Sequence, residues 1–558
     1  MADATGAGEA GVHPRPFVRD FRQILLWPIQ LLPPAEGAQS RQQHGERLAR
    51  LGGSWEEIAD EFTEDVRDFQ ERHYAEFVTF MPDVQRFLYG EAAGAAYGAS
   101  PIRVFRRRDV ATARAQFRPG ETPVEFTVAR VELYFFYDID LAIMAVELLC
   151  HDLSLAQAQD ALFRLGRAYP TTWAPDGGGT NCCTRISLHD ADGGELAVSD
   201  YEHKARYLAQ VCRHRTPRIA AHWQYLMHPL TPDEGPESAG PEGADGGIRF
   251  RPLEHQRIPV LGCLAVDDPA AIAREDWIRL GLLAPPGDAG VTPFAPAFLA
   301  DFETRHCYDR FWAADGRHDQ IVTRMLCSGQ AFVMVGDAGD PRYTDVLTGI
   351  TCQFRHQYFL LGLIAHFHRA ALLIFRDRLV TAISGLADYA PETVKRFKRA
   401  VRLTHENFLR FAHRYWFQEL SNQAPARDLF AMWAGHLGSN QLFAEVRQEV
   451  LDMIDYLDSD SLRRQANTVV RLTVVTFFGL IMSLTVGFLG AELININNRP
   501  AHEKAMHFLI VIVPMAAFIF YTAKKSHRLA EFVDAISDER QSIGYKLQAF
   551  VRIWKRKR

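Results

Sequence analysis

Two long apolar stretches stand out near the C-terminal end of the sequence. Residues 472–491 contain no charged side chain, and residues 505–523 contain no Asp, Glu, Lys or Arg. Each stretch is about long enough to cross a hydrocarbon core of roughly 30 Å as a helix that rises 1.5 Å per residue. A short polar segment separates them. This pattern predicts a transmembrane hairpin of two helices, with Pro514 inside the second one.

The basic residues around these stretches predict their orientation. The polar segment between them has only Arg499 and Lys504 as basic residues. The outer flanks are richer in basic residues: Arg463, Arg464, Arg471, Lys524, Lys525 and Arg528. Because positively charged flanks stay in the cytoplasm, we expect both chain ends there. The sequence therefore predicts a multi-pass protein of the cell inner membrane, with a large cytosolic region before residue 472.

The pattern also predicts one continuous helix over residues 441–493, because no proline interrupts this range. Steps of four and three residues follow one face of such a helix. From Asp455 the face passes through Ser459, Leu462, Ala466, Val469, Thr473, Thr476, Leu480, Ser483, Gly487 and Gly490. Small and hydroxyl residues on a membrane helix indicate close helix contact or a pore lining. Packing against the second span is the simpler alternative.

Before the membrane, the same helix has two unlike sides. One carries apolar residues at heptad-like spacing, namely Phe443, Val446, Val450, Met453 and Leu457. The other carries Asp452 and Asp455. This arrangement predicts a stalk helix with a packed outer side and an acidic inner side, although an ordinary solvated acidic surface would give the same pattern for either aspartate.

Taken together, the large cytosolic region, the stalk continuous with the first span, the short outer loop, the second span and the basic tail resemble the CorA family of divalent-cation transporters. That family has a Gly-Met-Asn motif at the outer end of the first span. Here the matching positions are Gly490, Ala491 and Glu492. The chain thus resembles a divergent member that lacks the motif. The match in detail covers about 100 C-terminal residues, and the rest is similar only in layout.

The resemblance implies a homo-oligomer, a pentamer in that family, with the first span around a central pore and Mg²⁺ as transported or regulatory ion. It implies a lining of Val469, Leu472, Thr476, Leu480, Ser483 and Gly487, and a mouth of Gly490, Ala491 and Glu492. Asp452, Asp455 and Glu492 are the candidate metal ligands. Carboxylates suit a hydrated divalent cation, and apolar rings can gate a pore by dewetting.

The fold class predicted is an α/β cytosolic domain followed by long helices and the hairpin. We expect a mostly helical region (1–95), the α/β domain (96–345) with a disordered insertion (229–247), long helices (346–440), the stalk and first span (441–493), the second span (505–523) and a basic cytoplasmic tail (524–558). Strands are predicted at 102–106 and 126–137, a β-hairpin at 186–199, and helices at 154–169, 351–384 and 391–422. The apolar runs 24–32 and 358–375 are expected to be buried, the first as a helix or a packed arm.

Composition narrows the choice of function. The chain has 558 residues, and its net charge of -6 gives no sign of a nucleic-acid partner. Its eight cysteines include no CxxC pair, which favours a reducing compartment. No P-loop, GxSxG, HExxH or dinucleotide glycine set is present, so we expect no enzyme. The alternatives to transport are a non-conducting oligomeric scaffold or sensor anchored in the membrane and, less directly, a membrane-tethered enzyme with a new kind of site.

Overall fold

The computed structural model describes residues 15–32, 43–58, 71–91, 100–136, 139–233, 247–253, 257–288, 290–313, 322–384 and 391–490, and scattered positions between 500 and 517. The chain divides into two compact units, Met1–Val450 and Leu451–Arg558. Residues 1–14, most of the predicted insertion 229–247, and the predicted tail 524–558 lie outside the described residues.

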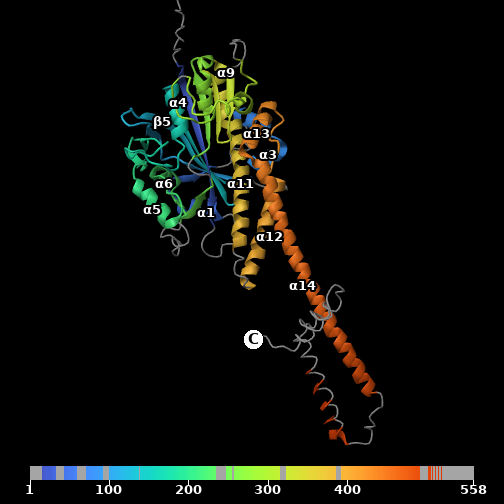
Figure 1. Ribbon diagram of the computed structural model, residues 1–558. Helices are drawn as coiled ribbons and strands as arrows, with labels where there is room; N and C mark the ends of the chain where they lie inside the picture. The colour runs from blue at the N-terminus through green and yellow to red at the C-terminus, as the bar shows by residue number, and fades with distance from the viewer. Residues whose placement is uncertain are drawn as a thin grey trace, which may run out of the picture. The chain divides into compact units, whose positions relative to one another are not determined.

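A single mixed β-sheet forms the centre of the first unit (Figure 1). Its main order is β12-β13-β14-β11-β1-β6-β5-β4-β7-β8, with β10 beside β1, β9 beside β10, β3 beside β5 and β2 beside β3. Most neighbours are antiparallel, whereas β11 and β14 run parallel, as do β9 and β10. The fourteen strands among the described residues are β1 (Phe17–Leu31), β2 (Trp55–Glu57), β3 (Ile102–Arg107), β4 (Thr112–Gln116), β5 (Val124–Phe136), β6 (Leu141–Ser154), β7 (Arg185–His189), β8 (Glu195–Val198), β9 (Leu230–Pro232), β10 (Ile248–Pro252), β11 (Val260–Val266), β12 (Cys307–Tyr308), β13 (Thr323–Cys327) and β14 (Ala331–Asp337).

The longest strand, β1, corrects the prediction for the N-terminal region. The apolar run 24–32 is not a helix, and residues 1–95 are not simply a helical region, because β1 lies in the middle of the sheet between β6 and β11. Both faces of this strand are covered, so its alternation of polar and apolar residues is lost. Pro28 fits because β1 changes partner on one edge at this point. Its pairing with β11 ends at Leu25, and its pairing with β10 begins at Ile29. The N–H that proline lacks therefore falls in the gap between two partner strands.

Several short helices connect the strands. They are α1 (Gln43–Leu51), α2 (Glu71–Thr79), α3 (Pro82–Tyr89), α4 (Leu155–Arg164), α5 (Lys204–His214), α6 (Ala221–Met227), α7 (Arg274–Gly281), α8 (Phe302–His306) and α9 (Pro341–Thr344). The predicted strands at 102–106 and 126–137 and the β7–β8 hairpin are confirmed. Ser154 caps α4 through a capping box with Gln157.

Helix α4 ends earlier than predicted, at Arg164 rather than near residue 169. Just beyond it, the chain passes close to the sheet at Gly166. A Cβ atom there would lie 2.9 Å from Leu25 Cδ2 and 3.2 Å from the carbonyl oxygen of Ile258. Arg167 then forms an isolated antiparallel bridge with Arg257. This tertiary contact replaces the last helical turn.

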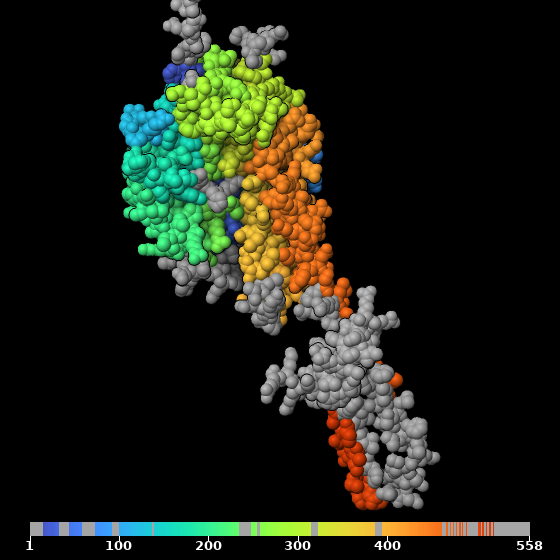
Figure 2. All heavy atoms as spheres, in the orientation of Figure 1, coloured from blue at the N-terminus to red at the C-terminus, as the bar shows by residue number. Residues whose placement is uncertain are grey.

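A helical part follows the α/β region, as predicted, and it packs on one face of the sheet. It consists of α10 (Ile350–Gln353), a π-helical segment η3 (Phe354–Tyr358), α11 (Phe359–Ser384), α12 (Pro391–Arg414) and α13 (Ala424–Leu437). Figure 2 shows this helical part in yellow and orange against the blue-to-green sheet region. The predicted helix 391–422 instead ends at Arg414, and the chain leaves it where His368 Nε2 donates to the carbonyl oxygen of Tyr415 (2.7 Å).

The range Ile350–Ser384 is the one helix of the described residues that is long and apolar enough to span a membrane. Its most apolar window is 83% buried inside the protein. It packs against β1, β6, α12 and α13, and Gly362 gives room for the indole of Trp433, which would lie 2.6 Å from a Cβ atom there. These contacts are those of a core helix, as predicted for residues 358–375.

The last described helix, α14, runs from Ser439 to Gly490 without interruption. Its 52 residues correspond to a length of about 78 Å. The helix predicted for residues 441–493 is therefore present over nearly all of that range. The described positions of the predicted second span are helical, but no hairpin is shown.

Candidate functional site

The predicted lining residues of α14 all lie on the surface of the single chain. Val469, Leu472 and Leu480 are 61%, 66% and 62% exposed. The other described members of the same face are exposed as well: Asp455, Ser459, Leu462, Ala466, Thr473, Thr476, Ser483 and Gly487. Water is a poor solvent for so many large aliphatic side chains. This face therefore favours an apolar surrounding, either lipid or another protein surface.

The hydroxyl groups on this face have a defined orientation. Thr473 Oγ1 donates to the carbonyl oxygen of Val469 (2.9 Å), and Thr476 Oγ1 donates to that of Leu472 (2.8 Å). Because each hydroxyl proton is used within the helix, each oxygen keeps its lone pairs for another group. Both hydroxyls can thus act as acceptors, which is the role that a cation requires.

The apolar stripe of α14 is the more buried side of the helix, as predicted, although Phe443 and Met453 are only partly buried. Val446, Val450 and Leu457 are at most 4% exposed. Phe443 stacks on Trp416 with ring centroids 4.4 Å apart. Asp452 and Asp455, on another side of the helix, are exposed. The two predicted sides of the stalk are therefore distinct in their burial.

Of the three predicted metal ligands, Asp452 and Asp455 fall within the described residues, and Glu492 does not. Asp452 and Asp455 lie one helical turn apart, whereas Ala491 and Glu492 lie outside the described residues and Gly490 is the last residue of α14. No three His, Cys, Asp or Glu side chains gather as metal ligands in the ranges that the structure describes. His366 and His368 are buried in the core, and burial lowers their pKa to about 3 and about 4.

A buried charge network lies where η3 packs on the sheet, and sequence reasoning missed it. The carboxylate of Glu147 is fully buried and contacts three arginines: Arg22, Arg130 at 2.6 Å between Nε and Oε2, and Arg355 at 3.1 Å between Nε and Oε1. The guanidinium of Arg130 lies 4.3 Å from the ring centroid of Phe359. A glutamate inside the apolar run of β6 was the available signal, because such a charge is rarely buried without partners.

Electrostatics hold this glutamate in its charged form. Burial alone would raise the pKa of Glu147, but the charges of Arg130, Arg22 and Arg355 outweigh burial and lower it to about 2. The neighbouring Glu132 accepts from Arg106 Nε (2.9 Å) and from the hydroxyl of Tyr134 (2.6 Å). The network joins β1, β3, β5, β6 and η3, so its role is to attach the helical layer to the sheet.

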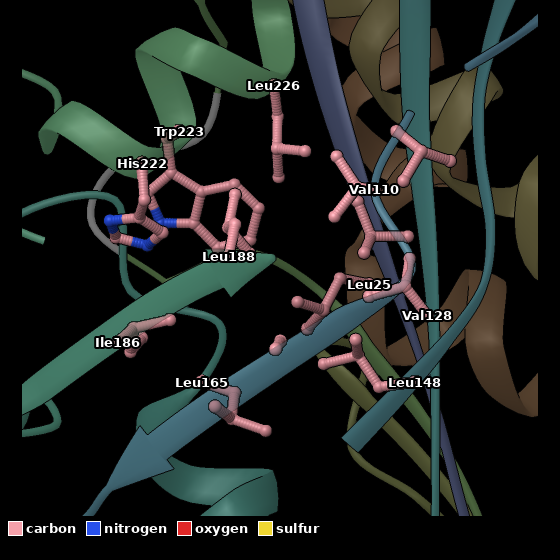
Figure 3. A pocket seen from close by; sticks show the side chains of 13 residues that line it. Leu25, Val110, Val128, Leu148, Leu165, Ile186, Leu188, His222, Trp223 and Leu226 are labelled. Carbon is pink, nitrogen blue, oxygen red and sulfur yellow. The ribbon is translucent and has the colours of Figure 1, made fainter. Parts of the chain in front are cut away.

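An apolar cavity of about 30 Å³ lies on the other side of the sheet (Figure 3). It is bounded by aliphatic residues of β1, β4, β5, β6 and β7 and by His222, Trp223 and Leu226 of α6. Burial lowers the pKa of His222 to about 3, so this ring is neutral at physiological pH. A space of this size with an apolar lining is a packing void rather than a substrate site.

The candidate site is therefore the exposed face of α14, with its acidic, aliphatic and hydroxyl positions. Comparison of the chain with models of protein families, with curated proteins and with solved structures finds no match in any of the three.

Proposed function

We propose that this protein is a CorA-like transporter or channel for divalent cations in the cell inner membrane, with Mg²⁺ or a related ion as cargo. Several copies, five if the family layout holds, place α14 around a central axis. A second span over residues 505–523 completes a hairpin with both chain ends in the cytoplasm. Divalent cations pass along the axis, and intracellular Mg²⁺ regulates the opening.

One observation carries the proposal: α14 is a single helix on which the acidic, aliphatic and hydroxyl positions of one face are all exposed. A second copy of the same face can cover the aliphatic residues, whereas lipid would gain nothing from the hydroxyls. The exposed residues Met506, Leu509, Ile510 and Val513 of the second predicted span have only apolar groups to offer, which suits contact with lipid.

In the oligomer each position becomes a ring. Rings of Asp452 and Asp455 concentrate cations before the pore, as carboxylates do for hydrated Mg²⁺. Rings of Val469, Leu472 and Leu480 form constrictions that open and close by wetting. The acceptor oxygens of Thr476 and Ser483 replace part of the hydration shell of the cation inside the pore. Gly487 has no side chain and therefore leaves room for the ion. Gly490, Ala491 and Glu492 form the outer mouth.

Flux into liposomes tests this assignment with two opposite changes. Leu480→Ser wets a constriction and is expected to raise Mg²⁺ flux, whereas Thr476→Val removes a ring of acceptor oxygens and is expected to lower it about fivefold, the effect of about 1 kcal/mol per ion. Leu347→Ser is the matched control, because Leu347 is 65% exposed but lies outside α14.

The replacement of the family's Met and Asn by Ala491 and Glu492 favours one other function, a non-conducting scaffold or sensor. The same liposomes distinguish the two. Intact oligomers without flux of Mg²⁺, Co²⁺, Ni²⁺ or Zn²⁺, in the wild type and in Leu480→Ser, would refute transport and leave the scaffold.

A further inference from the structure

Three arginines gather around one phenylalanine at the C-terminal end of α4 (helix labelled in Figure 1). The guanidinium carbons of Arg164, Arg167 and Arg257 lie 5.7, 4.7 and 5.4 Å from the ring centroid of Phe163. Arg167 and Arg257 are also direct partners in a β-bridge. The cluster is therefore held by the backbone as well as by ring contacts.

Among the described residues, one of the three arginines has a carboxylate partner. Arg164 Nε pairs with Asp160 at 2.8 Å, and Asp160 also binds Arg118 at 2.9 Å. Arg167 donates through Nε to the carbonyl oxygen of Phe163 (3.1 Å), and Arg257 donates through Nη2 to that of Leu283 (3.1 Å). In the part of the chain that the structure describes, neither has an ion pair, and each makes its side-chain hydrogen bond to a backbone carbonyl group.

Burial raises the free-energy cost of leaving these two arginines without a negatively charged partner. Arg167 is only 2% exposed, and Arg257 is half-buried. Burial, and then the charge of Arg167, lower the pKa of Arg257 to about 9, so it remains a cation at pH 7. Burial raises the pKa of the nearby Cys182 thiol to about 12, and therefore this group supplies no negative charge. The carbonyl end of α4 offers about half a negative charge, so the described residues leave more than one positive charge uncompensated.

We propose that Arg167 and Arg257 form a binding site for a phosphate group, with the ring of Phe163 as its floor. Guanidinium groups bind phosphate through paired N–H donors, and two of them match the roughly two negative charges of a phosphomonoester or of inorganic phosphate. A carboxylate carries a single charge and would compensate only one arginine. The half-buried Arg257 forms the solvent side of the site, and the buried Arg167 forms its inner side. The proposal does not depend on transport.

Thermal unfolding of the full-length protein in detergent tests the site. Tryptophan fluorescence is followed in chloride and in inorganic phosphate at equal ionic strength and pH. At a hundredfold excess over Kd, phosphate is expected to raise the Tm of the wild type by about 3 °C. Arg257→Gln should abolish this rise. Arg257→Lys keeps the charge but loses the paired donors, so it should weaken phosphate binding about tenfold.

Arg114→Gln is the matched control, because Arg114 is an exposed arginine already paired with Glu125 at 2.7 Å, and its full response to phosphate is expected. A parallel titration with glycerol 3-phosphate identifies the kind of ligand. Tighter binding of inorganic phosphate indicates a site for the free ion, and tighter binding of glycerol 3-phosphate indicates a site for a phosphate group carried on a larger molecule. No rise in Tm of the wild type with either ligand, or an equal rise in Arg257→Gln, would overturn the proposal.

Discussion

The buried glutamate of β6 allows a quantitative prediction. In Glu147→Gln, three arginines lose the anion that they share. The pKa of Glu147 falls from its usual 4.5 to about 2, and each tenfold change in proton affinity corresponds to about 1.36 kcal/mol. The charged carboxylate therefore stabilises the fold by about 3 kcal/mol, the range found when one partner of a buried ion pair is removed.

This stabilisation depends on pH in a defined direction. Because the pKa of Glu147 is lower in the folded than in the unfolded chain, the contribution is complete above pH 4.5 and is lost as the pH falls toward 2. At pH 3 about 2 kcal/mol of it is gone. The difference between wild type and Glu147→Gln should thus shrink to about 1 kcal/mol at that pH.

The assay is thermal unfolding of the full chain in detergent, followed by tryptophan fluorescence. For a unit of 450 residues, about 3 kcal/mol corresponds to a fall in Tm of roughly 3 to 4 °C at pH 7 and of about 1 °C at pH 3. Glu195→Gln is the control, because its partner Arg185 and Glu195 itself are about half exposed, and such pairs contribute under about 1 kcal/mol. Equal effects of the two variants, or a Glu147→Gln effect unchanged at pH 3, would refute the reasoning.

Three further predictions concern other parts of the chain. In Gly336→Ala the new Cβ would lie 2.2 Å from Tyr343 Cδ2. The ring cannot easily move away, because the Tyr343 hydroxyl donates a hydrogen bond to the carbonyl oxygen of Leu264 (3.0 Å). We therefore expect urea unfolding to show a destabilisation of about 3 kcal/mol. Ser154→Ala removes the capping box of α4 and should cost about 1 kcal/mol in the same assay, whereas an unchanged midpoint would mean that the cap is dispensable. Glu492→Asn removes charge from the proposed pore mouth and should change the ratio of Mg²⁺ to Co²⁺ uptake by liposomes, and an unchanged ratio would exclude a role at the mouth.

The elements that the sequence predicted correctly have a clear local signal. The start predicted at residue 154 agrees with Ser154 as the N-cap of α4, and the absence of proline indicated the length of α14. The missed elements depend on distant partners. The strand β1 looked like a buried helix because its two faces are both covered, and the end of α12 is set by a contact between His368 and Tyr415.

The functional residues also fall into a group that the sequence could predict and a group that it could not. The face of α14 could be predicted from residue spacing, since every member lies on one helix and helical geometry relates their positions. The Glu147 network and the Arg167–Arg257 pair could not, because their members are far apart in the sequence and come together only when the strands pair.

By itself, the amino-acid sequence determined the regular helical periodicity of this protein, the unequal sides of α14 and its apolar C-terminal stretches, because these follow from the order of neighbouring residues. Only the tertiary structure decided which strand lies at the centre of the sheet and which arginines share a carboxylate. The position of a strand in the sheet and the pairing of a buried charge depend on the residues that pack against them, and these residues are distant in the sequence.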